Sequence, residues 1–379
     1  MCDKKNSKKI KVLFILPGLN VCGGMESFIM NYYRGMDKDV FEFDFLVHNI
    51  GEKSYVNEIE SMGGNIIKMP PFGMKTLNEI KKLYQEILTK KKYDIVHCNM
   101  VNAAFIYLKY AQKYDVPVRI LHSHQDRAAD TFTHAVRNIP LIHVGKKYAN
   151  CNVACSVQAG EYLFGKNEYH IIQNCIDYDR YRFSEEIRKQ KRQDLGLEGK
   201  VVIGNTGRLC PQKNQMFLID VFNKYQELNK DSILLLIGEG DDEFHLKEKA
   251  KQLGISDKVV FTGARDDIDE LLQAMDVFVF PSLYEGLGIS ALEAQASGLH
   301  CLCSLGVPES ARISKLFKRI DLNKGEDAWC NEIVNAIDNE VNRKEIVIND
   351  DYDVKKCSHE LSELYLGGVE KNFKQQTNK

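Results

Sequence analysis

The sequence predicts an α/β protein built from two tandem, doubly wound domains, each with its own parallel sheet. Short apolar strand patterns alternate with helical patterns along most of the chain, which is typical of a parallel sheet with helices on both faces. The length of 379 residues exceeds one ordinary domain. A polar, charged and aperiodic segment, residues 173–199, separates two such series and is expected to be a linker.

These boundaries predict a domain over residues 1–175, a second over 176–354 and a final segment over 355–379 that contains an amphipathic helix. Open α/β sheets bind ligands at the carboxyl ends of their strands, so we expect a ligand-binding cleft between the two domains.

The first series opens with an apolar strand at residues 10–16, which Pro17-Gly18 ends and which a glycine turn and a helix follow. Further strands are expected at 41–47, 65–68, 94–97, 117–122, 153–156 and 169–172. Helices are expected at 53–62, 76–92, 101–114, 131–148 and 157–164. Pro140 has no N–H group to donate, so it should kink or interrupt the helix that contains it.

The second series repeats the alternation. Strands are expected at 201–206, 232–237, 259–262, 277–280 and 300–303. Helices are expected at 215–228, 243–253, 268–274, 288–296, 327–338 and 355–373.

Composition limits the class of protein. With 44% hydrophobic and 27% charged residues the chain is globular and not disordered. No apolar run approaches the ~18 residues that span a bilayer, and the polar N-terminus does not resemble a signal peptide, so we expect a cytoplasmic protein. The eleven cysteines are irregularly spaced, which favours buried, reduced thiols over disulfides or a zinc site.

Charge is distributed unevenly. Residues 1–175 carry 23 basic and 17 acidic residues, a net charge of +6, whereas the remainder carries 28 and 36, a net charge of −8. The first half also has a cluster of lysines in one helical stretch, namely Lys81, Lys82, Lys90, Lys91 and Lys92. This cluster is either a solvated helix face or a contact for an anionic membrane surface or lipid acceptor.

The most informative stretch runs from Val277 to Ala294 and predicts a buried strand, a tight turn and a helix start. Gly286 and Gly288 allow the turn, and the helix start offers free N–H groups to an anion. Two carboxylates, Glu285 and Glu293, flank this position. The combination suits a ligand that has both phosphate and hydroxyl groups, such as a sugar nucleotide.

A second candidate site follows the first strand of the second domain. Arg208 and Lys213 lie five residues apart in its loop, where they could hold a diphosphate without a metal. The alternative is an ordinary solvated pair of cations. No metal site is expected, because no His-Glu-x-x-His motif is present and no Asp-x-Asp stands at a strand end.

Three histidines end predicted strands of the first domain. His122 and His124 would face the cleft and could contact a donor sugar or an acceptor hydroxyl, or stabilise charge at the reacting carbon. The alternative is structural capping of the loop that follows. For His97 the structural alternative is the stronger one.

Several short motifs follow one another along the chain. They are Gly23-Gly24-Met-Glu26, Asn174-Cys-Ile-Asp177, Gly207-Arg208 with Gln212-Lys213-Asn214, Ile237-Gly-Glu-Gly240, Phe261-Thr-Gly-Ala, Asp276-Val-Phe-Val-Phe-Pro-Ser and the Glu285-x7-Glu293 spacing. In this order, over nearly the whole chain, they resemble the retaining glycosyltransferases of family four. That family has the GT-B fold of two Rossmann-like domains.

The resemblance implies roles on the donor side. Arg208 and Lys213 would bind the donor diphosphate in place of a metal. Glu293 would accept hydrogen bonds from the ribose hydroxyls, and Glu285 would contact the hydroxyls of the donor sugar. The backbone N–H groups that would lie close to the sugar are those of Gly286, Leu287 and Gly288.

It also implies roles elsewhere. Gly23 or Gly24 would allow close approach to the phosphate from the first domain, and Arg265 or its backbone would lie near the base. His124, or alternatively His122, would match the active-site histidine of the family, because the spacing His-Ser-His fits both alignments. The last helix would cross back to pack on the first domain.

The implied activity is that of a cytoplasmic, metal-independent, retaining glycosyltransferase without a cofactor. It would move a sugar from a nucleoside-diphosphate donor, such as a UDP-sugar, to a growing, lipid-linked saccharide. The nearest resemblance is to bacterial enzymes of capsular or exopolysaccharide synthesis, which implies peripheral contact with the inner membrane surface and no binding of nucleic acid.

Two departures and two alternatives accompany this assignment. Cys175 stands where the linker motif commonly has glycine, and the loop after Cys303 lacks the glycine-rich sequence of many relatives. A sugar-nucleotide 2-epimerase of the same architecture is one alternative, and a non-catalytic partner subunit is the other. The motif order argues against the first, and the intact set of Arg208, Lys213, Glu285 and Glu293 argues against the second.

Overall fold

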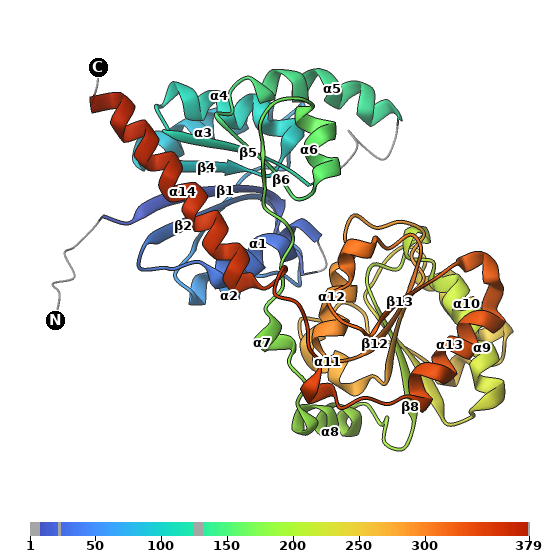
Figure 1. The fold of residues 1–379 in the computed structure, drawn as a ribbon. Coiled ribbons are helices and arrows are strands. Elements are labelled where there is room, and N and C mark those ends of the chain that lie inside the picture. Colours follow the sequence, from blue (N-terminus) through green and yellow to red (C-terminus); the bar gives the residue numbers. More distant parts are fainter. Residues whose placement is uncertain (1–7, 22–23, 125–131, 378–379) are drawn as a thin grey trace, which may run out of the picture. The chain divides into compact units, whose positions relative to one another are not determined.

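The computed structural model describes residues 8–21, 24–124 and 132–377, with the backbone alone described for 132–137 and 372–377. The chain forms two compact units (Figure 1). The first unit comprises Met1–Asn174 together with Lys355–Lys379, and the second unit comprises Cys175–Val354. The chain therefore leaves the first unit once and returns to it once.

The first unit contains a seven-stranded sheet in the order β3-β2-β1-β4-β5-β6-β7, in which all neighbouring strands are parallel. The strands are β1 (Ile10–Gly18), β2 (Phe41–Asn49), β3 (Asn65–Lys68), β4 (Ile95–Cys98), β5 (Val118–Ser123), β6 (Cys151–Ala154) and β7 (His170–Ile171). Its helices are α1 (Gly24–Gly35), α2 (Val56–Ser61), α3 (Leu77–Lys90), α4 (Ala104–Lys113), α5 (Phe132–Lys146) and α6 (Val157–Phe164).

Helices cover both faces of this sheet because its strands are apolar on both sides. On β1, Leu13 and Ile15 belong to the core that α3 and α4 cover. Phe14 points to the opposite face and stacks on Phe45 at 5.5 Å between ring centroids. Tyr33 of α1 meets Phe45 edge-on from that side.

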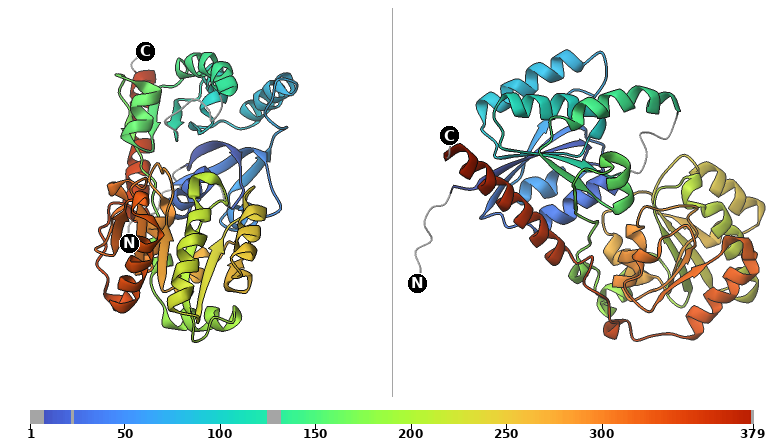
Figure 2. Two further views of the ribbon diagram at one scale, coloured as in Figure 1. Left: turned by 90° about the vertical axis from the view of Figure 1, so that its right-hand side faces the viewer. Right: turned by 45° about the horizontal axis from the view of Figure 1, so that its top comes forward.

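The C-terminal helix α14 (Val354–Thr377) runs along the first unit (Figure 2). Tyr365 is fully buried there, and its ring meets Phe41 edge-on at 5.8 Å. The predicted return of the last helix to the first domain is therefore confirmed.

The second unit contains a six-stranded sheet in the order β10-β9-β8-β11-β12-β13, again with all neighbouring strands parallel. The strands are β8 (Val201–Thr206), β9 (Ser232–Ile237), β10 (Val259–Phe261), β11 (Val277–Phe280), β12 (His300–Ser304) and β13 (Phe317–Ile320). Its helices are α7 (Tyr178–Tyr181), α8 (Glu185–Asp194), α9 (Gln215–Leu228), α10 (Glu243–Gln252), α11 (Ile268–Ala274), α12 (Ile289–Ala296) and α13 (Gly325–Asp338).

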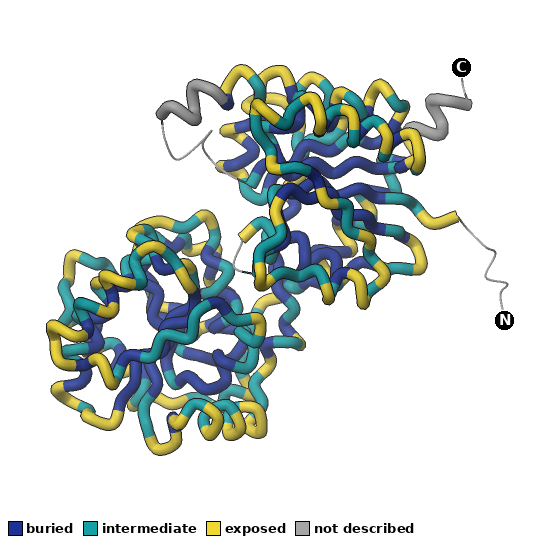
Figure 3. The backbone as a smooth tube through the Cα atoms, turned by 180° about the vertical axis from the view of Figure 1, so that it is seen from behind, coloured by how far each residue is buried: buried dark blue, intermediate teal, exposed yellow. Residues whose placement is uncertain are grey.

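Alternating residues of β11 separate two cores in this unit. Phe278 and Phe280 pack with α11 and α12 on one face, whereas Val277 and Val279 pack with α9 and α13 on the other. Figure 3 shows the buried stretches of the backbone gathered in the interior of each unit. Both units are thus doubly wound, as predicted.

The predicted linker was wrong in part, because helices α7 and α8 lie within residues 173–199. The charged residues that suggested a solvated linker make specific bonds. Ser184 caps α8 by accepting a hydrogen bond from the N–H of Ile187, and Arg188 and Arg192 of the same helix form ion pairs with Asp276. Helix α8 is held by its charged side chains and has no apolar stripe. Hydrophobic periodicity in the sequence therefore could not predict it.

Two further points concern single elements. Helix α5 continues through Pro140, so of the two effects expected of this proline, a kink or an interruption, the structure excludes the interruption. Strand β13 was not predicted at all: the sequence Phe-Lys-Arg-Ile contains two charges, which its place at the sheet edge tolerates.

Two observations concern membranes and thiols. Within the described ranges, no helix has both the length and the apolar character required to cross a membrane. Each cysteine that the structure describes is a free thiol; these are Cys98, Cys151, Cys155, Cys175, Cys210, Cys301, Cys303, Cys330 and Cys357.

Candidate active site

Three of the predicted donor-side residues, Arg208, Lys213 and Glu285, lie on loops that leave neighbouring strands of the second sheet. The strand order reverses between β8 and β11, and such a reversal opens a crevice at the carboxyl ends of the two strands. The loop after β8 carries Arg208 and Lys213 and leads to α9. The loop after β11 carries Glu285 and leads to α12.

Lys213 and Glu285 form an ion pair across these loops. Lys213 Nζ donates to Glu285 Oε1 over 2.6 Å, and the two side chains are only 17% and 8% exposed. The ammonium group also lies 4.7 Å from the centre of the Phe280 ring, a favourable cation–π distance. Sequence analysis identified both residues but did not predict that they touch.

Backbone hydrogen bonds hold the same two loops together. The N–H of Leu283 donates to the carbonyl of Gln212 over 2.8 Å, and the Gln212 side-chain amide donates to the carbonyl of Tyr284 over 2.9 Å. Asn214, whose backbone is left-handed with φ of 55°, reaches the carbonyl of Pro281. The position of Lys213 relative to Glu285 therefore does not depend on their ion pair alone.

A third loop, after β12, supports Glu285. The backbone N–H of Glu285 donates a hydrogen bond to the carbonyl of Gly306 in this loop, over 3.0 Å. A Cβ at Gly306 would lie 2.2 Å from the carbonyl oxygen of Leu283, so this position requires glycine. The loop after Cys303 thus needs a single glycine to reach Glu285, although it lacks the longer glycine-rich sequence.

Arg208 differs from Lys213 in its surroundings. It is exposed, and its guanidinium forms no ion pair with the described residues, whereas its carbonyl accepts a hydrogen bond from Gln215 over 3.1 Å. The two cations are therefore not equivalent: Lys213 is neutralised by a carboxylate, and Arg208 offers an unneutralised charge at the same strand end.

The backbone conformation of the turn before α12 requires glycine at one position. Gly288 has a φ of 86°, and a Cβ there would lie 3.3 Å from the Phe280 ring. Gly286 faces open space, and Leu287 packs on the core. Helix α12 begins at Ile289, one residue later than predicted.

Two buried hydroxyl groups at these strand ends were missed by sequence reasoning. Thr206 is the last residue of β8, and Ser282 follows β11. Neither Thr206 Oγ1 nor Ser282 Oγ has a hydrogen-bond partner among the described residues. Buried hydroxyls are normally satisfied, so polar ligand atoms or water are the expected partners. Lone serines and threonines carry no sequence signal that could have singled them out.

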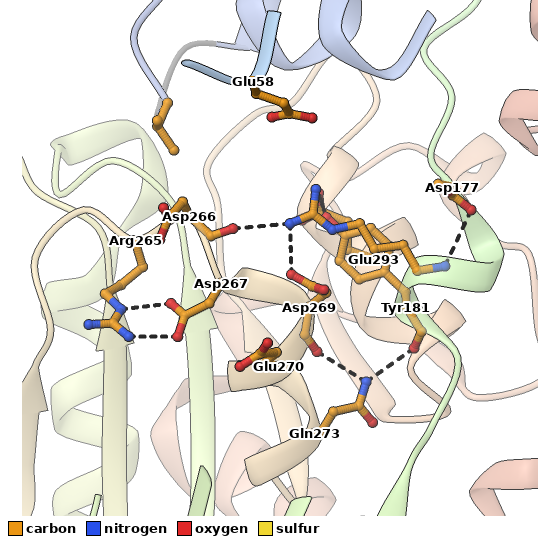
Figure 4. Close-up of polar contacts among 12 residues, drawn as sticks. Glu58, Asp177, Tyr181, Arg265, Asp266, Asp267, Asp269, Glu270, Gln273 and Glu293 are labelled. Atoms are coloured by element: carbon orange, nitrogen blue, oxygen red, sulfur yellow. Dashed lines mark hydrogen bonds and ion pairs between the residues drawn. The ribbon is translucent and has the colours of Figure 1, made fainter. Parts of the chain in front are cut away.

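Glu293 lies in the second turn of α12 and accepts a hydrogen bond from the hydroxyl of Tyr181, at 2.7 Å (Figure 4). Tyr181 was missed because its segment was taken for linker. A weak signal was available, since Asp177 is a typical helix cap and the tyrosines at 178 and 181 have helical spacing.

Arg265 is already bound within the protein. Its guanidinium donates to both carboxylate oxygens of Asp267, at 2.7 and 2.6 Å (Figure 4). Lys191 binds the same carboxylate. Burial would raise the pKa of Asp267, but the hydrogen bonds from Arg265 and Lys191 outweigh it and lower the pKa to about 2. Both partners therefore stay charged at neutral pH.

In the first unit, the histidines form a chain of ring contacts at the carboxyl ends of β4 and β5. His97 Nδ1 shares a hydrogen bond with the Tyr365 hydroxyl at 2.6 Å, and His97 Nε2 shares another with His122 Nδ1 at 2.9 Å. The ring of His122 stacks on that of His124, with 4.0 Å between the ring centroids. His124 Nε2 shares a hydrogen bond with the side-chain Oδ1 of Asn99 at 2.8 Å.

Burial keeps these histidines neutral. Loss of water lowers the pKa of His97 to about 3, with a smaller contribution from His124, and lowers the pKa of His124 to about 3. The same cause lowers the pKa of His122 well below its usual value. At neutral pH the chain therefore positions hydrogen bonds and carries no charge.

A cavity of about 260 Å³ opens beside His124 in the first unit. Its polar lining includes Asn99, Ser123, His124 and Asn138, and its apolar lining includes Met25, Met100, Val101, Ile142, Tyr162 and Leu163. His124 and not His122 lines this cavity, since His122 is fully buried. His97 is also fully buried, as the structural alternative for it expects.

The predicted glycine site cannot be compared in full. Gly23 lies outside the described residues. Gly24 begins α1 and is exposed, with open space where a Cβ would stand. No described residue therefore requires glycine at 24. No group of three His, Cys, Asp or Glu side chains suited to a metal ion occurs in the described part of the chain.

Known proteins resemble the chain in sequence. The family model "Glycosyltransferase Family 4" matches residues 22–180, and "Glycosyl transferases group 1" matches residues 187–340. The putative glycosyltransferase EpsF of Bacillus subtilis strain 168 is 32% identical over 342 residues, which cover 87% of this chain and 88% of that protein. The UDP-Gal:alpha-D-GlcNAc-diphosphoundecaprenol alpha-1,3-galactosyltransferase of Escherichia coli is 26% identical, with 78% and 81% covered.

Solved structures resemble the fold. Anabaena HepE in complex with UDP-glucose superposes with a TM-score of 0.71 at 16% identity, over 98% of this chain and 100% of that one. WaaG, a glycosyltransferase involved in lipopolysaccharide biosynthesis, superposes with a TM-score of 0.70 at 15% identity, over 94% and 100%. At this identity the likeness concerns the fold alone.

Proposed function

We propose a specific reaction for this chain, which belongs to glycosyltransferase family 4 and has the GT-B fold. It transfers a sugar from a UDP-sugar to a lipid-linked saccharide, with retention of configuration and without a metal ion. The observation that carries the proposal is the ion pair of Lys213 and Glu285 at the carboxyl ends of β8 and β11.

The donor diphosphate would lie between Arg208 and Lys213. An ammonium group has three donors, and Glu285 uses one of those of Lys213, so a phosphate oxygen can bind without breaking the ion pair. Arg208 can add a two-pronged contact to the phosphate, since its guanidinium is exposed. Lys213 would then connect the leaving phosphate with the carboxylate that contacts the sugar.

The chemistry follows from this arrangement. As the bond from the anomeric carbon to the diphosphate breaks, negative charge grows on the phosphate oxygens, and fixed cations stabilise it most at that moment. The acceptor hydroxyl would attack from the same face and pass its proton to a phosphate oxygen. No protein nucleophile is required, which agrees with the use of Glu285 as an ion-paired ligand for sugar hydroxyls.

The acceptor would use the cavity in the first unit. Its polar wall, with His124 and Asn99, suits sugar hydroxyls, because neutral imidazole and amide groups both donate and accept hydrogen bonds. Its apolar wall, with Met100 and Ile142, suits the less polar faces of a saccharide or its lipid carrier. His124 is the histidine that we place at the acceptor.

The donor and acceptor classes also rest on relatives. The Escherichia coli relative is named for a UDP-galactose donor and a diphosphoundecaprenol-linked acceptor. Contact with the membrane that holds such an acceptor would use basic residues of α3, among them the exposed Lys82 and Lys90. Lys91 does not contribute, because it binds Glu42 and Asp44.

A donor and acceptor assay tests the proposal. Purified protein is incubated with UDP-glucose, UDP-galactose and UDP-N-acetylglucosamine, with and without lipid-linked saccharide, and with and without EDTA. Acceptor-dependent release of UDP that survives EDTA and yields an axial product linkage from an axial donor is expected. Release of UDP and a free sugar derivative without acceptor would favour the epimerase, and activity that appears only with another subunit would favour the partner role.

A further inference from the structure

Tyr181 connects a short helix to Glu293, the glutamate to which the family resemblance gives the ribose hydroxyls. It ends α7, is 7% exposed, and donates its hydroxyl to Glu293 Oε1 on α12 at 2.7 Å (Figure 4). Glu293 is half-buried. The contact joins two elements that are more than a hundred residues apart in sequence.

Helix α7 is itself held in place. Asp177 caps it by accepting hydrogen bonds from the N–H groups of Asp179 and Arg180. The Arg180 guanidinium binds Asp269 of α11 at 2.8 Å, and the side-chain amide of Gln273 donates to the carbonyl of Tyr181 at 3.2 Å. Tyr181 therefore reaches Glu293 from a fixed backbone, which is the condition for one side chain to orient another.

The direction of the hydrogen bond is also fixed. Burial, together with the negative charge of Glu293, raises the pKa of the Tyr181 hydroxyl well above its usual value. The hydroxyl therefore keeps its proton and donates a hydrogen bond to the carboxylate. Glu293 is left as an acceptor group, which is the form that binds sugar hydroxyls.

We propose that Tyr181 is a positioning residue for ribose recognition, because its hydroxyl holds the Glu293 carboxylate in the orientation that accepts the ribose hydroxyls of a nucleoside diphosphate. The inference rests on the proposed function and adds a residue to it. A glutamate that is already oriented loses less side-chain freedom when the nucleotide binds, which strengthens binding without a new ligand contact. The effect is specific for ribose and independent of the base.

The test compares Tyr181→Phe with a matched control, Tyr178→Phe. Both tyrosines lie on α7 with exposures of 7% and 8%, and both variants keep the ring that packs in the core. Wild type is first titrated with UDP, GDP, ADP and CDP by calorimetry. The nucleotide that binds best is then compared with its 2′,3′-dideoxy form in all three proteins, and thermal unfolding checks that each variant is folded.

We expect Tyr181→Phe to bind the ribose nucleotide about tenfold more weakly, the scale of one hydrogen bond to a charged group. Binding of the dideoxy nucleotide should change less than about twofold, and Tyr178→Phe should resemble wild type. In a Glu293→Ala background, adding Tyr181→Phe should have almost no further effect, because the group that it orients is gone.

Other outcomes overturn the inference in distinguishable ways. Equal loss for the ribose and dideoxy forms would assign Tyr181 to folding alone. Unchanged binding in Tyr181→Phe would remove its positioning role and leave the donor site intact. Wild-type protein that binds the ribose and dideoxy forms equally would remove the role of Glu293 as well. Wild-type protein that binds no nucleoside diphosphate would overturn the proposed function and the inference together.

Discussion

The strand ends of the two units use opposite chemistry. In the second unit they carry charges, because Lys213 pairs with Glu285 and Arg265 pairs with Asp267. In the first unit the described strand ends carry neutral rings and amides, since burial lowers the pKa of His97 and His124 to about 3. Among the described residues, the two parallel sheets thus support a charged site and an uncharged one.

This difference matches the two proposed ligands. A diphosphate brings charge and needs cations at fixed positions, whereas a saccharide brings hydroxyls and needs neutral donors and acceptors. A charged group in the first site would lose hydration without gaining a counter-ion from the described residues. The contrast can be tested by changing one region at a time.

The largest effect is expected from the ion pair. Lys213→Ala and Glu285→Ala should each lower turnover by roughly 10²-fold or more, the scale of losing one transition-state contact. Turnover is measured at saturating donor and acceptor. Lys224→Ala is the matched control, because this lysine forms an ion pair with Asp327 at the surface of the same unit. Near-normal turnover in both active-site variants would refute the assignment of this site.

A smaller effect is expected from the acceptor side. His124→Ala should lower transfer to the acceptor by about fivefold, the scale of one neutral hydrogen bond, because neutral His124 orients hydroxyls and neutralises no developing charge. Donor binding, measured by calorimetry with UDP, should stay the same. An equal loss of donor affinity would contradict the division of roles between the units.

Acid should separate the units. A histidine whose pKa is lowered on folding stabilises the native state fully above about pH 6.5, the pKa of the unfolded chain. This stabilisation is lost as the pH falls towards 3, the pKa of His97 in the folded protein. Protonation linked to His97 alone should lower the free energy of unfolding of the first unit by about 1.4 kcal/mol per pH unit in this range. Asp267, whose pKa is about 2, contributes stability to the second unit that is lost only below about pH 4.

The single tryptophan allows the measurement. Trp329 is fully buried in α13 and reports on the second unit, whereas circular dichroism reports on both. Between pH 6.5 and 4.5 the urea midpoint by circular dichroism should fall before the midpoint by tryptophan fluorescence does. His122→Phe should reduce the dependence on pH. Coincident midpoints at every pH would show that the units do not unfold separately.

The smallest effect is expected from Arg265. Its guanidinium is already bound to Asp267, so Arg265→Ala should change UDP affinity by less than about twofold and stability by about 1 kcal/mol or less, the usual range of a partly exposed ion pair. A tenfold loss of affinity would mean that Arg265 leaves Asp267 to bind the base.

Much of the fold was predictable because its signals are local. The strand at 277–280 and the helix at 268–274 were predicted with the bounds that the structure has, since each is a short apolar pattern between clear breaks. Helix α8 was not, because its charges face partners such as Asp276 that are distant in sequence. Strand β13 gains its regularity from pairing with β12 and not from its own residues.

The site was predictable as a set of residues but not as a set of contacts. Arg208, Lys213, Glu285 and Glu293 stood out by spacing and by resemblance. The contacts of these residues could not be predicted from the sequence. The ion pair of Lys213 joins positions 72 residues apart, and Tyr181, the partner of Glu293, lies in the segment that was expected to be a linker. Tyr365 likewise reaches His97 from the far end of the chain. Contacts of this kind arise only when the sheets have formed.

The return of α14 to the first unit has a consequence for synthesis. The second unit is an insertion in the chain of the first, and its two ends are joined by hydrogen bonds between Ile176 and the residues Tyr352 and Val354. During translation the second unit can therefore complete its core while the first still waits for Tyr365. The hydrophobic face that α14 covers stays open until then, which makes it the surface where a chaperone would be expected to act on the nascent protein.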